Sequence, residues 1–124
     1  MRFRNAVRRS LVSLAIAAGA TAALVAPANA GMGGCNRDVC ITILGNGLRV
    51  DSVTARLAHG VSFTGHFHIW GGGIDFTTHT QNWNGSNASY RLNVGRDLPN
   101  GSVVCVEGWS GGRSLGRPCG EIKF

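Results

Sequence analysis

The chain has 124 residues, of which 12 are Lys or Arg, 6 are Asp or Glu, and 44% are hydrophobic. This length accommodates one domain, and the apolar fraction is too high for an intrinsically disordered protein. Four of the 12 basic residues lie within residues 1–30, so the rest of the chain carries eight basic against six acidic side chains. This near balance, without a run of basic residues, argues against a nucleic-acid partner.

Residues 1–30 are predicted to be a cleaved secretory signal peptide. The basic residues at its start are Arg2, Arg4, Arg8 and Arg9. Residues 11–25 form an apolar stretch that is short for a membrane-spanning helix, and Ala28-Asn29-Ala30 provides a small-residue cleavage site. The Arg8-Arg9 pair also fits a twin-arginine signal, so the export route stays open. We expect residues 31–124 to be one secreted, extracellular domain with no membrane span.

All four cysteines, Cys35, Cys40, Cys105 and Cys119, lie in the exported part of the chain. An even number of cysteines in a short exported protein indicates two disulfides. We expect Cys35 to pair with Cys40 and Cys105 with Cys119, because each pair is close in sequence. The alternative, Cys40 with Cys105, would join two sheets as in immunoglobulin domains, but Val103 stands where those domains have a Tyr.

From Val39 onward, short β-branched and aromatic runs alternate with Gly, Asn and Pro, and no run has helical spacing. The expected strands are 39–44, 48–57, 62–70, 74–81, 89–94, 102–109 and 121–124. The pairs Asn46-Gly47, Asn84-Gly85 and Asn100-Gly101 predict tight turns between these runs. The predicted fold is all-β, a small two-layer sandwich of immunoglobulin-like size with about seven short strands and two disulfides.

A histidine cluster is the first candidate site. Alternation along 62–70 places Phe67 and Ile69 on one face and His66 and His68 on the other. With a two-residue turn at Gly72-Gly73, the expected cross-strand pairs are Trp70 with Asp75, His68 with Thr77 and His66 with His79. His66, His68 and His79 would then share a face, an arrangement that suits zinc or copper. The alternative is a solvated polar face that binds no cofactor.

Two tryptophans are the second candidate. Trp70 and Trp83 fall on the polar face or at its end, where aromatic rings form either a platform for a sugar or protein partner or a lid over the core. The segment Gly108-Trp109-Ser110-Gly111-Gly112 matches the nucleophile elbow of serine hydrolases by letter. No helix can follow it, and 94 residues cannot house that fold, so we expect no enzyme.

Two segments carry a family resemblance. Residues 39–48, with their Gly-x-Gly-Leu turn, and the closing residues 104–109 and 116–119 resemble small secreted actinobacterial β-domain proteins of unknown function. More distantly, the same turn and the short C-terminal strand resemble the neocarzinostatin-type apoproteins. That resemblance implies an immunoglobulin-like sandwich that holds an apolar chromophore, although the cysteine spacings differ and no binding residue is carried over.

Three function classes follow from these observations. A non-catalytic extracellular domain that binds an unknown ligand or protein is favoured, because no coherent catalytic set is present. An extracellular zinc- or copper-binding protein is the second. The third is a small secreted serine-protease inhibitor, in which Cys105 and Cys119 would tether a loop that contains Arg113-Ser114.

Overall fold

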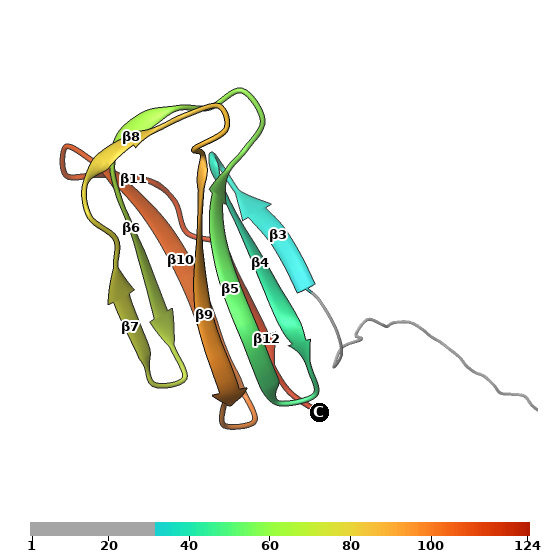
Figure 1. Cartoon of the computed structure of the whole chain (residues 1–124). Coiled ribbons are helices and arrows are strands. Elements are labelled where there is room, and N and C mark those ends of the chain that lie inside the picture. Colours follow the sequence, from blue (N-terminus) through green and yellow to red (C-terminus); the bar gives the residue numbers. More distant parts are fainter. Residues whose placement is uncertain (1–31) are drawn as a thin grey trace, which may run out of the picture.

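The computed structural model describes residues 32–124, and the predicted signal peptide at residues 1–30 lies outside this range. The described chain forms ten strands in two sheets and no helix, which confirms the predicted all-β, two-layer fold (Figure 1). Within residues 32–124, therefore, no helix is long and apolar enough to cross a membrane.

The smaller sheet has four antiparallel strands in the order β3-β4-β5-β9. These strands are β3 (Met32–Asn36), β4 (Val39–Asn46), β5 (Arg49–Leu57) and β9 (Ser89–Asp97). The turn between β4 and β5 contains Gly47 at φ 62°, in the left-handed region that the Asn46-Gly47 pair predicts. The last strand, β9, joins β5 from far along the chain.

The larger sheet has six strands built around β6 and β10. Its strands are β6 (Phe63–Gly71), β7 (Ile74–Thr77), β8 (Gln81–Trp83), β10 (Ser102–Ser110), β11 (Arg113–Gly116) and β12 (Cys119–Ile122). The strands β7 and β8 both pair with β6, whereas β11 and β12 both pair with β10. Figure 1 shows β8 at the end of the sandwich where the chain passes from β7 to β9.

The ten strands exceed the expected seven for identifiable reasons. The sequence of β3, MGGCN, contains no β-branched or aromatic residue, so its pairing with β4 and the bond from Cys35 to Cys40 make it a strand. The short β11 is the return strand of a hairpin through Gly111-Gly112. The single strand expected at 74–81 is divided into β7 and β8 by an irregularity at residues 78–80.

The core lies between the two sheets and consists of the inward-facing side chain of every second residue along the strands. Phe67 and Ile69 of β6 are fully buried, as the alternation predicts. Phe76 of β7 lies on the same side and stacks on Tyr90 of β9, with ring centroids 5.3 Å apart. The buried apolar core comprises Val39, Ile41, Ile43, Val50, Val53, Ala55, Leu57, Phe63, Phe67, Ile69, Ile74, Trp83, Leu98, Val104, Val106 and Ile122.

Both predicted disulfides are confirmed, and no cysteine is free in the described chain. Cys35 lies directly opposite Cys40 across the β3–β4 ladder, and Cys105 lies opposite Cys119 across the β10–β12 ladder. Each bond therefore joins neighbouring strands of one sheet. The bridge between sheets that Cys40 and Cys105 would have made is absent from residues 32–124.

Gly65 provides a stability test of the packing of β6 against β10. A Cβ at Gly65 would lie 1.8 Å from the carbonyl oxygen of Trp109, a backbone atom that moves only if β10 moves. We expect Gly65→Ala to lower the free energy of unfolding by about 3 kcal/mol, measured by urea denaturation. The control is Gly34→Ala, where a Cβ meets no atom within 4 Å and the expected change is about 0.5 kcal/mol or less. Equal losses in the two variants would contradict the predicted packing.

Candidate functional site

The outer face of the six-stranded sheet is the candidate site, and β6 supplies its centre. Because Phe67 and Ile69 point into the core, the side chains of His66, His68 and Trp70 point outward and are half-buried. The cross-strand pairs of His68 with Thr77 and of Trp70 with Asp75 occur as predicted, which confirms the Gly72-Gly73 turn. His66, His68 and Trp70 are therefore the residues that β6 contributes to the outer face.

The neighbouring strand β10 contributes a second set of outward-facing side chains. Val104 and Val106 are fully buried, so the alternate residues Cys105, Glu107 and Trp109 belong to the outer face. In the antiparallel register the pairs are Cys105 with Trp70, Glu107 with His68 and Trp109 with His66. Each outward residue of β6 therefore has a chemically different neighbour across the ladder.

A row of polar side chains runs diagonally across this face, because Asp75 lies opposite Trp70 and Ser114 lies opposite Trp109. Nε2 of His68 lies 2.8 Å from Oδ1 of Asp75 on β7. On the other side of His68, Glu107 accepts a hydrogen bond of 2.6 Å at its Oε2 from the Ser114 hydroxyl on β11. The row therefore runs Asp75, His68, Glu107, Ser114, with adjacent members on adjacent strands.

Aromatic rings lie on both sides of this row. The ring of Trp70 stacks on that of His68, with centroids 4.6 Å apart and an angle of 21° between the planes. The Cys105–Cys119 disulfide lies beside Trp70, because Cys105 is its cross-strand partner. Trp109 lies at the other end of the face, opposite His66. The two tryptophans thus bracket the polar row.

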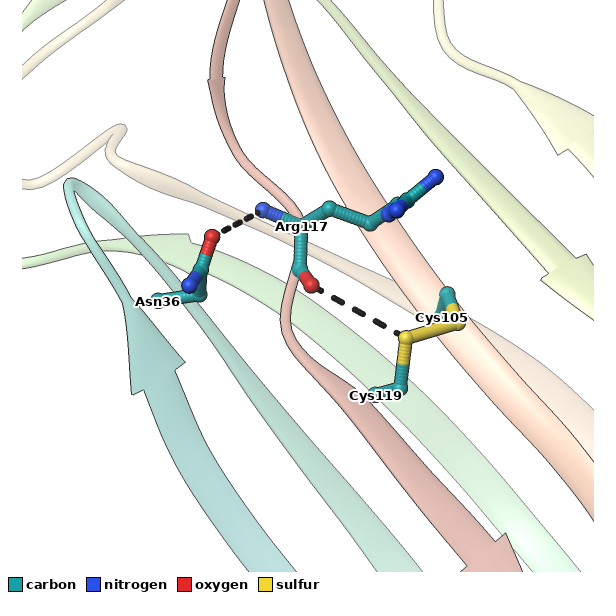
Figure 2. The surroundings of a disulfide bond; sticks show 4 residues. All are labelled: Asn36, Cys105, Arg117 and Cys119. Atoms are coloured by element: carbon teal, nitrogen blue, oxygen red, sulfur yellow. Dashed lines mark hydrogen bonds between the residues drawn. A yellow bond between two sulfur atoms is a disulfide. The ribbon is translucent and has the colours of Figure 1, made fainter.

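Arg37 and Arg117 lie beside the Glu107 and Ser114 end of the polar row. A hollow of about 340 Å³ is lined by Asn36, Arg37, Glu107, Ser114 and Arg117. The Arg37 guanidinium donates a hydrogen bond to the Ser114 carbonyl oxygen, and the Arg117 backbone N–H donates to Oδ1 of Asn36 at 2.9 Å. Figure 2 shows the Arg117 side chain extending away from Asn36 and toward β10. This hollow continues the outer face to the edge of the sheet.

The backbone of Arg117 also contacts the neighbouring disulfide. Its carbonyl oxygen lies 3.8 Å from Sγ of Cys119 (Figure 2). A disulfide sulfur carries no hydrogen, so this approach is a contact and not a hydrogen bond. Together with the bond to Asn36, it holds the backbone that carries the Arg117 guanidinium.

The structure does not bring His79 to His66 and His68. Between the Ile69–Phe76 pair and the Gly65–Gln81 pair, β6 advances four residues while the facing chain advances five. An extra residue of this kind reverses the face that the following side chains take. His79 accordingly lies with Gln81, its Nε2 2.5 Å from Oε1 of that residue.

The extra residue is accommodated by Thr78. The Phe67 N–H donates to the Thr78 hydroxyl at 3.0 Å, and the Thr78 N–H donates to the Phe67 carbonyl at 2.9 Å. One side chain thus replaces a backbone acceptor of the ladder. In the described chain, no group of three or more His, Cys, Asp or Glu side chains is arranged to hold a metal ion, so the three histidines do not form the zinc or copper site that was one of the two alternatives.

Trp83 differs from Trp70 in its position. It is 1% exposed, its ring lies 4.9 Å from that of Phe67, and its Nε1–H donates a hydrogen bond to the Gly65 carbonyl at 2.9 Å. The interpretation of Trp83 as part of a surface platform is therefore wrong, and the alternative that it closes the core is right. Its pairing with Phe63 explains this, because the shifted register of β8 turns Trp83 inward.

The elbow-like segment 108–112 and the Arg113-Ser114 segment lie in one hairpin, formed by β10 and β11. Ser110 ends β10 and pairs with Arg113 across the Gly111-Gly112 turn, so the elbow-like motif leads into a strand and not into a helix. Arg113 is exposed in β11, while the Ser114 carbonyl already accepts a hydrogen bond from Arg37. Since the Arg113-Ser114 segment is paired and bonded within the sheet, the hairpin does not favour the inhibitor hypothesis over the outer face.

Sequence reasoning missed the contributions of Glu107, Arg37 and Arg117, and it did not place Trp109 on this face. Alternation along residues 103–109 places Glu107 and Trp109 on one face, but only the pairing of β10 with β6 brings them beside His68 and His66.

The resemblances to small secreted actinobacterial proteins and to the neocarzinostatin-type apoproteins stay predictions. No protein-family model, curated protein or solved structure matches this chain.

Proposed function

We propose that this chain is a secreted, non-catalytic binding domain, and that its binding surface is the outer face of the six-stranded sheet. The binding surface is defined by His66, His68, Trp70, Asp75, Glu107, Trp109, Ser114 and Arg117. The observation that carries the proposal is that half-buried aromatic rings and hydrogen-bonding side chains from four strands converge there. Such a combination is typical of sites that orient a ligand.

Two further observations support this proposal. Both disulfides fit an oxidising extracellular environment. Ser114, the serine nearest the centre of the face, donates its hydroxyl hydrogen to Glu107, while His68 is bonded to Asp75. In a Ser-His-Asp triad the serine hydroxyl is hydrogen-bonded to the histidine, so this row does not have the connections of that triad.

The proposal is tested by measuring which proteins and carbohydrates the immobilised chain binds from the cells that secrete it. The full-length chain is expressed with export, purified, immobilised and exposed to the envelope fraction and culture medium of the cells that secrete it. Retained protein and carbohydrate are quantified separately. We expect the double variant Trp70→Ala, Trp109→Ala to retain at least about 10-fold less than the wild type, because tryptophans are among the residues that contribute most to binding energy.

The matched control is Leu44→Ala. Leu44 is 42% exposed on β4, in the other sheet, and its truncation should leave retention unchanged. Equal retention by the wild type and the double variant, or no retention by any of the proteins, would refute the binding surface. Circular dichroism of each purified variant establishes that it is folded before the comparison is made.

A further inference from the structure

We infer that the ligand of the binding surface is an uncharged oligosaccharide, which lies along β6 and β10 between Trp109 and Trp70. The inference rests on the proposed function and names the class of its ligand. Three properties of the surface lead to it: the balance of charge, the mixture of hydrogen-bond donors and acceptors, and the position of the aromatic rings relative to the polar row.

Charges of both signs lie close together on this surface. The carboxylates of Asp75 and Glu107 lie on either side of His68, and the hollow beside Glu107 includes Arg37 and Arg117. A polyanion would be placed against the two carboxylates, and a polycation against the two guanidinium groups. Juxtaposed like charges weaken binding, so this surface favours a ligand without net charge.

The polar row and the adjoining Arg117 offer both kinds of hydrogen-bonding group. Carboxylates accept hydrogen bonds, a guanidinium donates them, and a hydroxyl or a neutral imidazole does both. Asp75, Glu107 and Arg117 therefore present acceptors and donors within one continuous patch. Sugar hydroxyl groups are uncharged, both donate and accept hydrogen bonds, and recur on every ring of an oligosaccharide, so they match such a patch along its length.

The aromatic rings lie at the ends of the patch. Trp70 pairs with Cys105 and Trp109 pairs with His66, so the two tryptophans are four residues apart along the strands, a spacing of about 14 Å. Several sugar rings in a row fit this interval. The apolar C–H faces of the terminal rings would contact the tryptophans, while the hydroxyl groups of the middle rings would lie over His68 and Glu107.

This arrangement is the reverse of that in a protein–protein interface. In such interfaces the aromatic anchors cluster at the centre and polar groups form the rim. Here the centre is the polar pair of His68 and Glu107, and the tryptophans are peripheral. A folded protein docked on this face would have to desolvate the row at its centre. The order of the residues therefore favours a glycan over a protein partner.

The experiment uses defined oligomers and the exported full-length protein. Cellohexaose, chitohexaose and xylohexaose are the uncharged probes, hexagalacturonate is the anionic probe and chitosan hexamer is the cationic probe. Binding is measured by isothermal titration calorimetry. We expect at least one uncharged hexamer to bind with a Kd between about 1 mM and about 1 μM, and to bind at least about 10-fold more tightly than either charged hexamer.

Variants then locate the binding. Trp109→Ala and Glu107→Gln are each expected to weaken the Kd of the bound hexamer at least about 10-fold, while Trp70→Phe, which retains an aromatic ring, should weaken it less than Trp70→Ala. The control is Leu44→Ala on β4, a residue that is 42% exposed and lies in the other sheet. Its Kd should stay within about 2-fold of the wild type.

The outcomes separate this inference from the proposed function. If material is retained in the first experiment, but no uncharged hexamer binds or a charged one binds more tightly, the inference is overturned and the binding surface stands. Binding of an uncharged hexamer that Trp109→Ala and Glu107→Gln leave unchanged also overturns it, since the sugar then binds elsewhere. Failure of both experiments overturns the proposed function as well.

Discussion

Replacement of Trp83 by alanine is expected to lower the free energy of unfolding by about 3–5 kcal/mol. The side chain is 1% exposed and is the largest that is fully buried in the described chain. Its removal leaves a cavity against Phe67 and deprives the Gly65 carbonyl of its hydrogen bond from Nε1. Urea denaturation followed by far-UV circular dichroism measures the loss.

A second tryptophan provides the matched control. Trp70 is half-buried on the outer face, where its main aromatic contact is the stacked ring of His68. We expect Trp70→Ala to cost about 1 kcal/mol, the value of a single aromatic pair. Comparable losses from Trp70→Ala and Trp83→Ala would contradict the assignment of one tryptophan to the surface and the other to the core.

Removal of the Cys105–Cys119 disulfide is expected to be the second large effect. The double variant Cys105→Ala, Cys119→Ala should lose about 3 kcal/mol, because the bond closes a loop with a sequence separation of 14. The Cys35–Cys40 bond has a separation of only 5 and restricts the unfolded chain less, so its removal should cost about 2 kcal/mol. Denaturant midpoints of the two double variants, with cooperativity compared through the m-value, provide the measurement.

The prediction is tested by which disulfide variant loses more of its free energy of unfolding. A greater loss from the Cys35–Cys40 variant would mean that strand β3 contributes more to the folded state than its exposed side chains indicate. The Cys105–Cys119 variant also has a local consequence. Cys105 is the cross-strand partner of Trp70, so any movement of this strand pair should alter the near-UV circular dichroism of the tryptophans.

The features that were predictable from the sequence depend on contacts between near neighbours in the chain. The disulfide partners are 5 and 14 residues apart, and the register of the β6–β7 hairpin follows from alternation and one glycine turn. Each prediction needed only the geometry of a pleated strand and of a tight turn. The two-sheet fold follows from the same short, alternating runs.

The errors occurred where one residue interrupted that local order. The alternation of 74–81 gives no sign that Thr78 would accept a hydrogen bond from Phe67 through its side chain. Where the Thr78 hydroxyl takes the place of a backbone acceptor, the facing chain contains one extra residue. His79 and Trp83 therefore take the opposite face from the one expected. The predicted histidine cluster and the interpretation of Trp83 as part of a platform both assumed an uninterrupted strand.

The binding surface was only partly predictable. Trp70 and the two outward histidines follow from alternation in β6, but Glu107 and Trp109 reach them through pairing of β10 with β6. Arg37 is supplied by the β3–β4 turn, and it reaches the sheet through a hydrogen bond to Ser114. Pairings between distant segments leave no periodic trace in the sequence, and the chemistry of this face depends on them.

The two long-range pairings, β5 with β9 and β6 with β10, also determine how the molecule folds. Arg56 must meet Ser89 and Trp70 must meet Cys105, so two large loops close before either sheet is complete. Loop closure of this kind places folding in the range of about milliseconds to seconds. Until β9 and β10 join them, β3–β4–β5 and β6–β7–β8 are two separate sets of paired strands. A chain that ends before residue 89 would therefore retain the Cys35–Cys40 disulfide and the strands β3 to β8, but neither sheet would be complete.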